Sequence, residues 1–166
     1  MSFEIERKFL LQEIPQSLIE EGELQLQSEH RIEQTYLALA GDQELRVRKI
    51  KDLSTGEVTY THTFKKGHGL LREEVEYEIS EGIYEQITGI HQAVPLTKNR
   101  VTANWNGRII EVDLYDQIDL MVLEVEFASE EEAVGFTPPD WFGLDISTNK
   151  EYSNKKVWKE LQERSS

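Results

Sequence analysis

The sequence predicts an α+β fold that is mainly β, an eight-stranded antiparallel closed barrel with a few flanking helices. Segments rich in Val, Ile, Thr, Tyr and Phe recur along the chain with apolar and polar residues in alternation, which is typical of strands. Turn signals separate these segments, so neighbouring strands are expected to pair as antiparallel hairpins. About eight strands is the number at which a closed barrel has a lumen just wide enough for side chains or one small ligand.

The expected strands follow one another with short breaks between most of them. They cover residues 3–10, 29–39, 44–51, 57–66, 72–80, 97–105, 108–115 and 121–128. Three of the breaks have the composition of hairpin turns: Gly41-Asp42, Ser54-Thr55-Gly56 and Asn106-Gly107. The last is the strongest signal, because Asn and Gly both accept the positive φ angles of a type I′ turn.

Helices are expected at residues 15–22, 81–92, 129–135 and 153–164. The third begins with Ser129 followed by three glutamates, which suits a helix N-terminus. The fourth is short and charged, and Ser153 or Asn154 is expected to cap it. Its apolar side chains are Val157, Trp158 and Leu161.

Length and charge limit the class of protein. A chain of 166 residues without a low-complexity linker fits one domain, 1–166. Charged residues make up 30% of it, unusually many for a core of this size, so some of them are expected inside the fold. The 32 acidic and 18 basic residues give a net charge of −14, which repels DNA, RNA and anionic membrane surfaces. Nucleic acid and membrane partners are therefore not expected.

The absence of cysteine excludes a disulfide framework and a thiolate metal site, and it suits a reducing compartment. The first residues, MSFEIERKFLL, carry charges where a signal peptide needs a continuous apolar stretch. No other run approaches the roughly 20 apolar residues of a membrane span. A cytoplasmic protein is expected, and any metal ion in it would have oxygen or imidazole ligands.

Charged side chains lie on one face of seven of the expected strands. In the first strand Glu4, Glu6 and Lys8 share a face, because successive side chains alternate across a strand, and apolar residues take the other face. The same separation recurs in six later strands. The full set has seven basic and seven acidic members: Lys8, Arg46, Arg48, Lys65, Arg72, Lys98 and Arg100; Glu4, Glu6, Glu74, Glu76, Asp113, Glu124 and Glu126.

A polar sheet face exposed to water accounts for any single strand of this kind. Solvated faces usually mix Thr, Ser, Gln and Lys, whereas several of these strands carry charge of one sign only. Closure into a barrel would put all the charges inside, where each needs a partner. Arg and Lys opposite carboxylates match a polyphosphate bridged by divalent cations. Carboxylates without His or Cys favour Mg²⁺ or Mn²⁺ as the cation.

The segment EIERKF at residues 4–9 resembles the N-terminal ExExK signature of the CYTH, or triphosphate tunnel metalloenzyme, family. The resemblance continues in family order over nearly the whole chain, with QTYL at 34–37, LRVR at 45–48, TFK at 63–65, REEVE at 72–76, KNR at 98–100, EVDLY at 111–115 and LEVEF at 123–127. NKEYSNK at 149–155 resembles the segment that leads into a helix near one tunnel mouth in short bacterial members.

The resemblance implies an eight-stranded antiparallel tunnel, a divalent cation and a triphosphate-bearing substrate. It assigns metal binding to Glu4, Glu6, Asp113, Glu124 and Glu126. It assigns phosphate binding to Lys8, Arg46, Arg48, Lys65, Arg72, Lys98 and Arg100. The catalytic candidates are Glu6, Lys8, Tyr36 and Glu126, where Tyr36 resembles a tyrosine that partners the signature lysine in some hydrolytic members. Glu74 and Glu76 would bind metal, orient the attacking water or pair with neighbouring arginines.

Activities within this family differ, and the shared motifs do not choose among them. The compact chain resembles the short bacterial type, which favours inorganic triphosphate as the substrate, with hydrolysis to diphosphate and phosphate. Alternatives are a thiamine or nucleoside triphosphatase and a class IV adenylate cyclase. The cyclase needs an adenosine site, for which Trp105, Trp141 and Phe142 are candidates, although aromatic residues beside Pro and Gly are more often part of a core. A polyphosphate-binding module without activity also remains open, as does the choice between a monomer and a homodimer.

Overall fold

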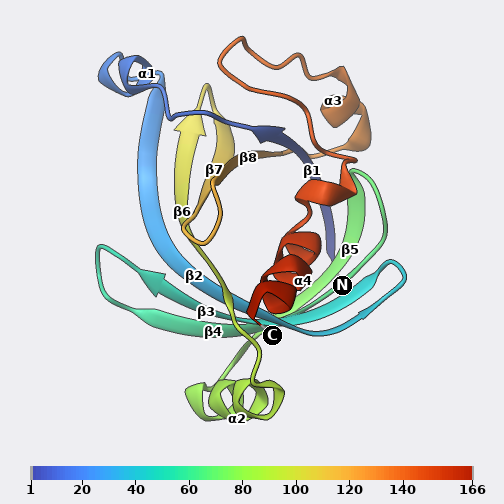
Figure 1. Cartoon of the computed structure of the whole chain (residues 1–166). Coiled ribbons are helices and arrows are strands. Elements are labelled where there is room, and N and C mark those ends of the chain that lie inside the picture. Colours follow the sequence, from blue (N-terminus) through green and yellow to red (C-terminus); the bar gives the residue numbers. More distant parts are fainter. Residues whose placement is uncertain (1, 166) are drawn as a thin grey trace.

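The computed structural model describes residues 2–165, and it contains a closed antiparallel barrel, which confirms the predicted fold (Figure 1). Around the barrel the strands follow the order β1-β5-β4-β3-β2-β6-β7-β8. Their bounds are β1 Ser2–Leu10, β2 Leu24–Ala40, β3 Gln43–Asp52, β4 Val58–Lys66, β5 Leu71–Ile79, β6 Leu96–Trp105, β7 Arg108–Tyr115 and β8 Leu120–Glu126.

The predicted helices are also present, with ends that shift by a few residues. They are α1 Gln16–Glu20, α2 Glu81–His91, α3 Glu130–Gly135 and α4 Asn154–Ser165, and a short 3-10 helix, η1, covers Lys150–Tyr152. The Ser129 side chain accepts a hydrogen bond from the Glu132 amide at 3.1 Å, as expected of a cap. At α4 the capping residue is Ser153, whose hydroxyl accepts a hydrogen bond from the Lys156 amide.

Strand β2 begins five residues before the predicted start at residue 29, which corrects that boundary. Residues 24–28 pair with Thr102–Trp105 of β6 across a bulge. In this extension Leu24 is buried whereas Leu26 is exposed, so only one of its two leucines packs into the core. The extension is held mainly by pairing with β6, a long-range contact that the local sequence does not reveal.

The hairpin between β6 and β7 turns at the predicted Asn-Gly pair. Asn106 has a φ of 51° and Gly107 a φ of 80°. Both angles lie in the left-handed region, as a type I′ turn requires. This tight connection keeps β6 and β7 in register, with Arg100 opposite Asp113.

Strand β1 closes the barrel by changing its neighbour halfway along. Residues Ser2–Ile5 pair with β5, and residues Glu6–Leu10 pair with β8. The second half of β1 would therefore have one open edge. Residues 143–147 cover that edge, since the Ile146 amide donates to the Lys8 carbonyl at 2.8 Å and the Leu10 amide donates to the Leu144 carbonyl at 2.9 Å.

The main apolar core lies outside the barrel, against the wall formed by β1, β6, β7 and β8. It includes Phe9, Trp105, Ile110, Leu123 and Phe142, and side chains from the segments around α1 and α3 pack against it. Several of these are aromatic and meet at close range, such as Phe9 and Phe142 with ring centroids 4.9 Å apart. Figure 1 shows α1 and α3 at this end of the molecule.

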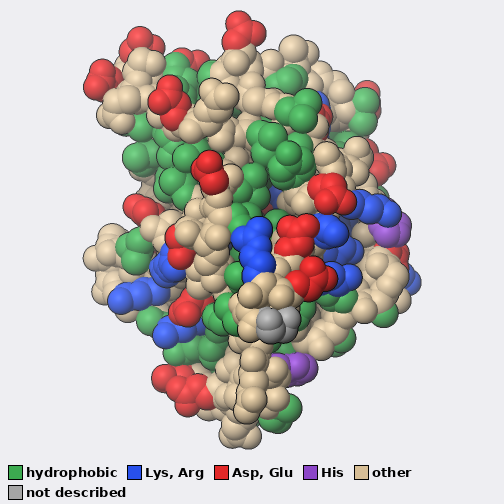
Figure 2. All heavy atoms as spheres, viewed as in Figure 1, with side chains coloured by type: hydrophobic (Ala, Val, Ile, Leu, Met, Phe, Trp, Pro, Cys, Tyr) green, Lys and Arg blue, Asp and Glu red, His purple; other side chains and the backbone are tan. Residues whose placement is uncertain are grey.

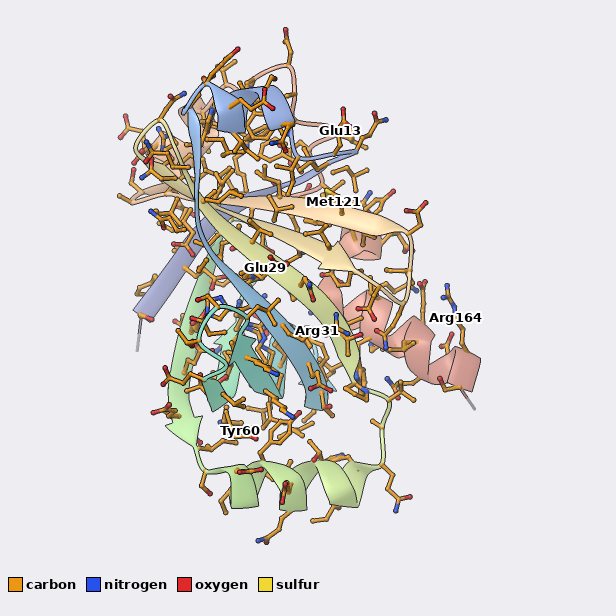
Figure 3. All side chains as sticks on the ribbon, turned by 90° about the vertical axis from the view of Figure 1, so that its left-hand side faces the viewer. Glu13, Glu29, Arg31, Tyr60, Met121 and Arg164 are labelled. Atoms are coloured by element: carbon orange, nitrogen blue, oxygen red, sulfur yellow. The ribbon has the colours of Figure 1, made fainter. Side chains whose placement is uncertain are left out.

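Two further helices contact other parts of the barrel. Helix α2 packs on the outer face through Tyr84, whose ring lies 4.9 Å from that of Tyr60, and Figure 3 shows Tyr60 on the side facing α2. Helix α4 lies across one opening of the barrel (Figure 1), where Val157 packs with Leu96, Val122 and Ile146. Within residues 2–165 no helix is both long and apolar enough to cross a membrane.

Candidate active site

The barrel encloses a cavity of about 290 Å³ whose walls are strongly charged. Figure 2 shows acidic and basic side chains side by side on the face of the molecule that carries α4. Alternation along each strand places the charged residues here and the apolar ones outside. The lining residues are Glu4, Glu6, Lys8, Tyr36, Glu44, Arg46, Arg48, Lys65, Arg72, Glu74, Glu76, Arg100, Glu111, Glu124, Glu126, Ser153, Asn154 and Lys155.

Two acidic residues of the tunnel were absent from the sequence prediction. Glu44 lies on β3 on the same face as Arg46, and Glu111 lies on β7 on the same face as Asp113. Both follow the alternation that revealed the other members, so extending the pattern to the strand ends would have found them. The predicted balance of seven acids and seven bases is therefore wrong, since these two bring the acids described inside the barrel to nine, and Lys155, which also lines the cavity, brings the bases to eight.

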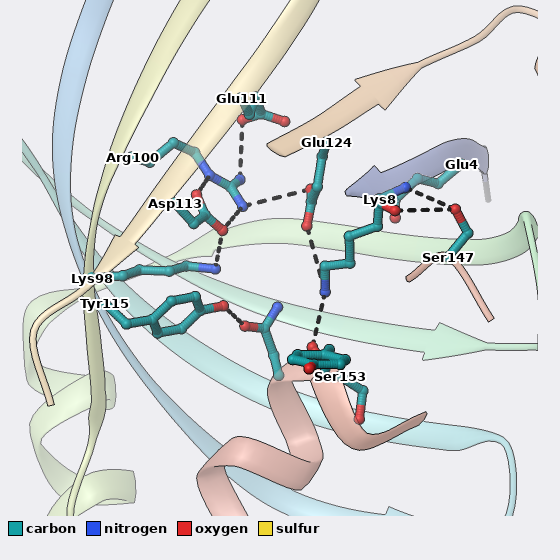
Figure 4. A network of polar contacts seen from close by, with 12 residues as sticks. Glu4, Lys8, Lys98, Arg100, Glu111, Asp113, Tyr115, Glu124, Ser147 and Ser153 are labelled. Carbon is teal, nitrogen blue, oxygen red and sulfur yellow. Dashed lines mark hydrogen bonds and ion pairs between the residues drawn. The ribbon is translucent and has the colours of Figure 1, made fainter. Parts of the chain in front are cut away.

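Two predicted members, Lys98 and Asp113, lie in the barrel interior but outside the lining of the cavity. Their side chains are 0% and 1% exposed, and the Lys98 ammonium lies 2.7 Å from the Asp113 carboxylate (Figure 4). Arg100 binds the same carboxylate with two nitrogens, at 2.7 and 2.9 Å. Burial lowers the pKa of Lys98 to about 7, although the charge of Asp113 opposes the shift. Asp113 is thus fully engaged by two bases, and its contacts position Arg100 toward the cavity.

Carboxylates from β1, β8 and β7 lie next to one another on one side of the cavity. The register places Glu6 opposite Glu126, and Glu111 opposite Glu124. Burial raises the pKa of Glu6 well above its usual range, and the negative charges of Glu124 and Glu4 raise it further. This crowding of like charges would be relieved by a bound cation.

The first carboxylate of the signature, Glu4, interacts with a base. Its oxygens accept hydrogen bonds from the Lys65 ammonium at 3.0 and 3.1 Å. Although burial opposes the change, hydrogen bonding with Glu74 and the charge of Lys65 hold the pKa of Glu4 below its usual range. The same hydrogen bond with Glu4, together with burial, raises the pKa of Glu74 to about 7. Opposite pKa shifts of this kind are typical of two carboxyl groups that titrate as a coupled pair.

Arginines crowd the opposite part of the cavity. Arg48 donates to the Gln34 side chain at 3.0 Å, and the nearest carboxylate to Arg46 is that of Glu44, at 3.9 Å. Burial lowers the pKa of Arg48 to about 10, and the positive charges of Arg46 and Arg100 contribute to the same shift. The buried Nε atoms of Arg46 and Arg72 have no hydrogen-bond partner. These cations are positioned to accept an anion.

Glu74 and Glu76 have partners other than the neighbouring arginines, which were one of the expectations for them. Glu74 lies 3.5 Å from the Lys65 ammonium, and Glu76 accepts a hydrogen bond from the Thr63 hydroxyl at 2.8 Å. Both side chains line the cavity, so pairing does not remove them from the site. Tyr36 lines it too, with its hydroxyl 3.5 Å from the Gln34 amide nitrogen. The Tyr36 ring also packs against Trp158 of α4 at 5.5 Å.

The beginning of α4 contributes a part of the wall that the strand pattern could not indicate. Ser153, Asn154 and Lys155 line the cavity. Asn154 accepts a hydrogen bond from the Tyr115 hydroxyl, and the Lys8 ammonium lies 3.5 Å from the Tyr152 carbonyl. Helix α4 therefore closes one end of the tunnel, and the last residue of η1, just before it, contacts the signature lysine.

The aromatic residues considered for an adenosine site belong to the apolar core. Trp105 and Phe142 are buried, and the ring centroids of Trp105 and Trp141 lie 5.6 Å apart. None of the three lines the tunnel cavity. Their placement agrees with a role in packing and gives no support to a base-stacking site in the tunnel.

The donors on the carboxylate side of the cavity are all oxygen atoms, which suits a hard divalent cation. Within residues 2–165, no three side chains of His, Asp or Glu come together closely enough to hold a metal ion by themselves. Several carboxylates are instead engaged by lysine or arginine. A cation would thus be bound by rearranged carboxylates, or jointly by carboxylates and phosphate oxygens, as Mg²⁺ often is in proteins.

Comparison with known proteins agrees with this geometry. The CYTH domain model matches residues 2–137. An inorganic triphosphatase from Nitrosomonas europaea is 34% identical over 158 residues, which are 93% of this chain and 95% of the relative. An inorganic triphosphatase from Acetivibrio thermocellus is 30% identical over 162 residues, or 96% of this chain and 95% of the relative. A solved structure of an inorganic triphosphatase is 31% identical, covers 95% of both chains and has a TM-score of 0.61. The chain belongs to the CYTH domain family.

Proposed function

We propose that this protein is a divalent-metal-dependent triphosphatase that hydrolyses inorganic triphosphate to diphosphate and phosphate. Both named relatives, which match at least 93% of the chain, are inorganic triphosphatases. Their substrate is small enough to be enclosed whole by a cavity of this kind, with no need for a nucleoside pocket. The preferred metal is Mg²⁺ or Mn²⁺, because the available ligands are carboxylates and phosphate oxygens.

The observation that carries the proposal is the separation of unsatisfied charge inside one closed cavity. Burial and neighbouring positive charges lower the pKa of Arg48, while burial and neighbouring negative charges raise that of Glu6. Both groups contain a member without a counter-ion: within residues 2–165, Arg48 and Glu6 form no ion pair, whereas Arg100 and Glu124 lie 3.8 Å apart. A polyanion that carries divalent cations satisfies both groups at once, whereas a simple anion or a metal ion alone satisfies only one.

The roles of the residues follow from where they lie. Phosphate oxygens would be bound by Lys8, Arg46, Arg48, Lys65, Arg72 and Arg100, with Lys98 contributing its charge from behind Asp113. The cations would be held by Glu4, Glu6, Glu124 and Glu126, with Asp113 positioning Arg100. When bound, a divalent cation neutralises phosphate charge and lowers the pKa of a coordinated water.

In the proposed reaction a water attacks a terminal phosphorus of triphosphate, the bridging P–O bond breaks and diphosphate leaves. Glu6 or Glu126 accepts the proton of the water, and the raised pKa of Glu6 increases its affinity for that proton. Arg46, Arg48 and Arg100 stabilise the charge that develops on the phosphate oxygens. Substrate and bases are held in place by the barrel wall, so positioning supplies much of the rate increase.

The test is a panel that combines Mg²⁺, Mn²⁺ or no metal with tripolyphosphate, ATP, GTP or thiamine triphosphate, with release of phosphate as the readout. We expect tripolyphosphate to have the largest kcat/KM, and no turnover without metal. A larger kcat/KM for thiamine triphosphate or a nucleotide would reassign the substrate. Formation of cyclic AMP from ATP would make the protein a cyclase. Binding of tripolyphosphate without turnover under every condition would make it a polyphosphate-binding module.

A further inference from the structure

The edge of β1 that carries Lys8 is not covered by another strand of the barrel. Glu6 is the last β1 residue whose amide points toward the start of β5, donating to the Leu70 carbonyl at 3.2 Å. Beyond it, residues 143–147 take the place of β5 along this edge. The Gly143 amide donates to the Leu10 carbonyl at 2.8 Å, so the replacement continues to the end of β1. We call residues 143–147 the edge segment.

Both main-chain groups of Lys8 are bound by the edge segment. The Lys8 amide donates to the Ser147 hydroxyl oxygen at 2.9 Å, and the Lys8 carbonyl accepts from the Ile146 amide at 2.8 Å. At the far end of the side chain, the ammonium lies 3.8 Å from Glu124. Figure 4 shows the Lys8 main chain beside Ser147 and its ammonium directed into the tunnel. The main chain of Lys8 is thus held by contacts outside the tunnel, while its ammonium group lies inside the tunnel.

The Ser147 hydroxyl is itself held in one orientation. It donates to Asp145 Oδ1 at 2.5 Å, and the same oxygen accepts from the Ser147 amide at 2.9 Å. A hydroxyl has a single proton, so donation to Asp145 leaves its lone pairs free to accept from the Lys8 amide. Asp145 therefore determines which way the Ser147 hydroxyl points.

Asp145 is anchored in turn by Arg7, which lies on the outer face of β1. The guanidinium is 2.7 Å from Asp145 Oδ2, and it donates to the carbonyls of Ala133 and Phe136 at 3.1 and 2.7 Å. It also lies over the ring of Phe9 at 5.2 Å. Arg7 thus ties together β1, the end of α3 and the edge segment, and its side chain is only 14% exposed.

We propose that Arg7, Asp145 and Ser147 are positioning residues for Lys8, forming a chain of contacts outside the tunnel that fixes a phosphate-binding side chain inside it. This inference rests on the proposed function, since it takes Lys8 to bind triphosphate. Contacts of this kind affect turnover because a displacement of a binding group by about 1 Å is enough to slow a reaction strongly. None of the three residues needs to touch the substrate.

The sharpest test removes the Ser147 hydroxyl in two backgrounds. We would measure kcat and KM for tripolyphosphate with wild type, S147A, K8A and the double variant S147A/K8A. Loss of one hydrogen bond that fixes Lys8 is expected to lower kcat/KM of S147A by about five- to tenfold. In the K8A background the same change should lower it by less than about twofold, because no lysine remains to be positioned.

The chain offers a matched control for the loss of a serine hydroxyl. Ser54 donates to Asp52 Oδ1 at 2.8 Å, and its amide donates to the same oxygen at 2.9 Å, in an exposed turn. This repeats the Asp145–Ser147 geometry far from Lys8 in the fold. S54A should leave kcat/KM within about twofold of wild type. S147T, which retains the hydroxyl, should keep most of the activity lost in S147A.

Equal losses from S147A in the two backgrounds would overturn the proposal, as would a loss no larger than that of S54A. If either result is obtained while the wild type still hydrolyses tripolyphosphate, the positioning proposal fails but the triphosphatase assignment does not. If the wild type binds tripolyphosphate without hydrolysing it, the proposed function fails, and the wild type and the same three variants are compared by calorimetric Kd. If the wild type does not bind tripolyphosphate, both inferences fail together.

Discussion

The two faces of the wall formed by β1, β7 and β8 differ sharply although they belong to the same strands. On the inner face Glu6, Lys8 and Glu124 line a charged cavity, whereas on the outer face Phe9 and Leu123 belong to a dry aromatic and aliphatic core. A one-residue step along a strand moves a side chain from one environment to the other. The comparison shows that the barrel wall has two separate roles. Its inner side chains bind ligands, and its outer side chains pack into the apolar core.

This division has an energetic reason. Removing charged groups from water is costly, and ion pairs inside a protein commonly recover only part of that cost. The inner face therefore contributes little net stability, and its unpaired charges lower the stability of the fold. The outer core offsets this cost by burying large apolar side chains, each worth about 1.5–3 kcal/mol. We expect changes on the two faces to affect different measurements.

The largest loss of stability should come from the outer core. Phe142 is buried, and its ring lies 4.9 Å from Phe9 and 4.6 Å from Trp141. F142A is expected to lower the free energy of unfolding by about 3–5 kcal/mol through the cavity it leaves. Urea unfolding followed by tryptophan fluorescence measures this, while kcat per folded molecule should stay within about twofold. I90A, at a residue 81% exposed on α2, is the control and should change stability by less than about 0.5 kcal/mol.

The opposite result is expected for the inner face at Glu6. E6Q removes a candidate base and metal ligand, so kcat should fall by about 100-fold or more. Its stability at neutral pH should be equal to or above that of wild type, because a buried carboxylate beside Glu124 and Glu4 is replaced by a neutral group. E33Q, on the outer surface beside Lys49, is the control and should retain wild-type kcat. Full activity of E6Q would remove Glu6 from the proposed mechanism.

A change in the edge segment, which joins the two faces, is expected to have a smaller effect on both stability and catalysis. A Cβ atom at Gly143 would lie 2.4 Å from the Leu10 carbonyl oxygen, so G143A forces the edge segment away from β1. It should lower stability by about 1–3 kcal/mol and also raise KM for tripolyphosphate, through the shift at Lys8. In G89A the new Cβ meets open space within α2, and the change should be neutral or stabilising. An unchanged KM in G143A would indicate that the edge segment can move independently of Lys8.

The smallest effect concerns the dependence of stability on pH. Although burial opposes the change, hydrogen bonds from Ser147 and Arg7 hold the pKa of Asp145 below its usual 3.8. A depressed pKa stabilises the fold above the unfolded value of about 3.9, and that stability is lost as pH falls through the folded pKa. Asp145 is 41% exposed, so solvent limits the contribution to below about 1 kcal/mol. Wild type should exceed D145N in urea stability at pH 7, and the difference should shrink as pH falls below the unfolded value of about 3.9. A difference independent of pH would contradict this.

The strand alternation was enough to predict most of the charged face that lines the cavity, because a two-residue periodicity is a local property of the sequence. Closure into a barrel was predicted from the number of strands and the family resemblance. The prediction missed Glu44 and Glu111, which continue the same faces toward the strand ends. The alternation also could not tell which carboxylates are paired with bases, because Asp113 and Glu6 both follow it. Asp113 is bound by Lys98 and Arg100, whereas Glu6 lies beside other carboxylates. That distinction depends on which strands become neighbours.

The edge segment was beyond the reach of the sequence for a related reason, and the start of α4 was placed near a tunnel mouth only by the family resemblance. Residues 143–147 have no periodic pattern of their own, and their hydrogen bonds go to β1, at the other end of the chain. Lys155 was likewise not predicted in the cavity wall, because no strand pattern includes it and only the packing of α4 over the tunnel mouth brings it there. Such contacts are properties of the closed fold and not of any one segment.

The dependence of β1 on residues 143–147 also has a consequence for how the molecule forms. Ser147 and Lys8 are 139 residues apart in sequence, and the pairing of β1 with β8 spans almost as far. Contacts over such distances carry a high loop-closure entropy and form late in folding. During synthesis the first strand emerges long before its partners, with a charged face that has nothing to bind. The signature lysine can acquire its working position only after residues 143–147 have left the ribosome.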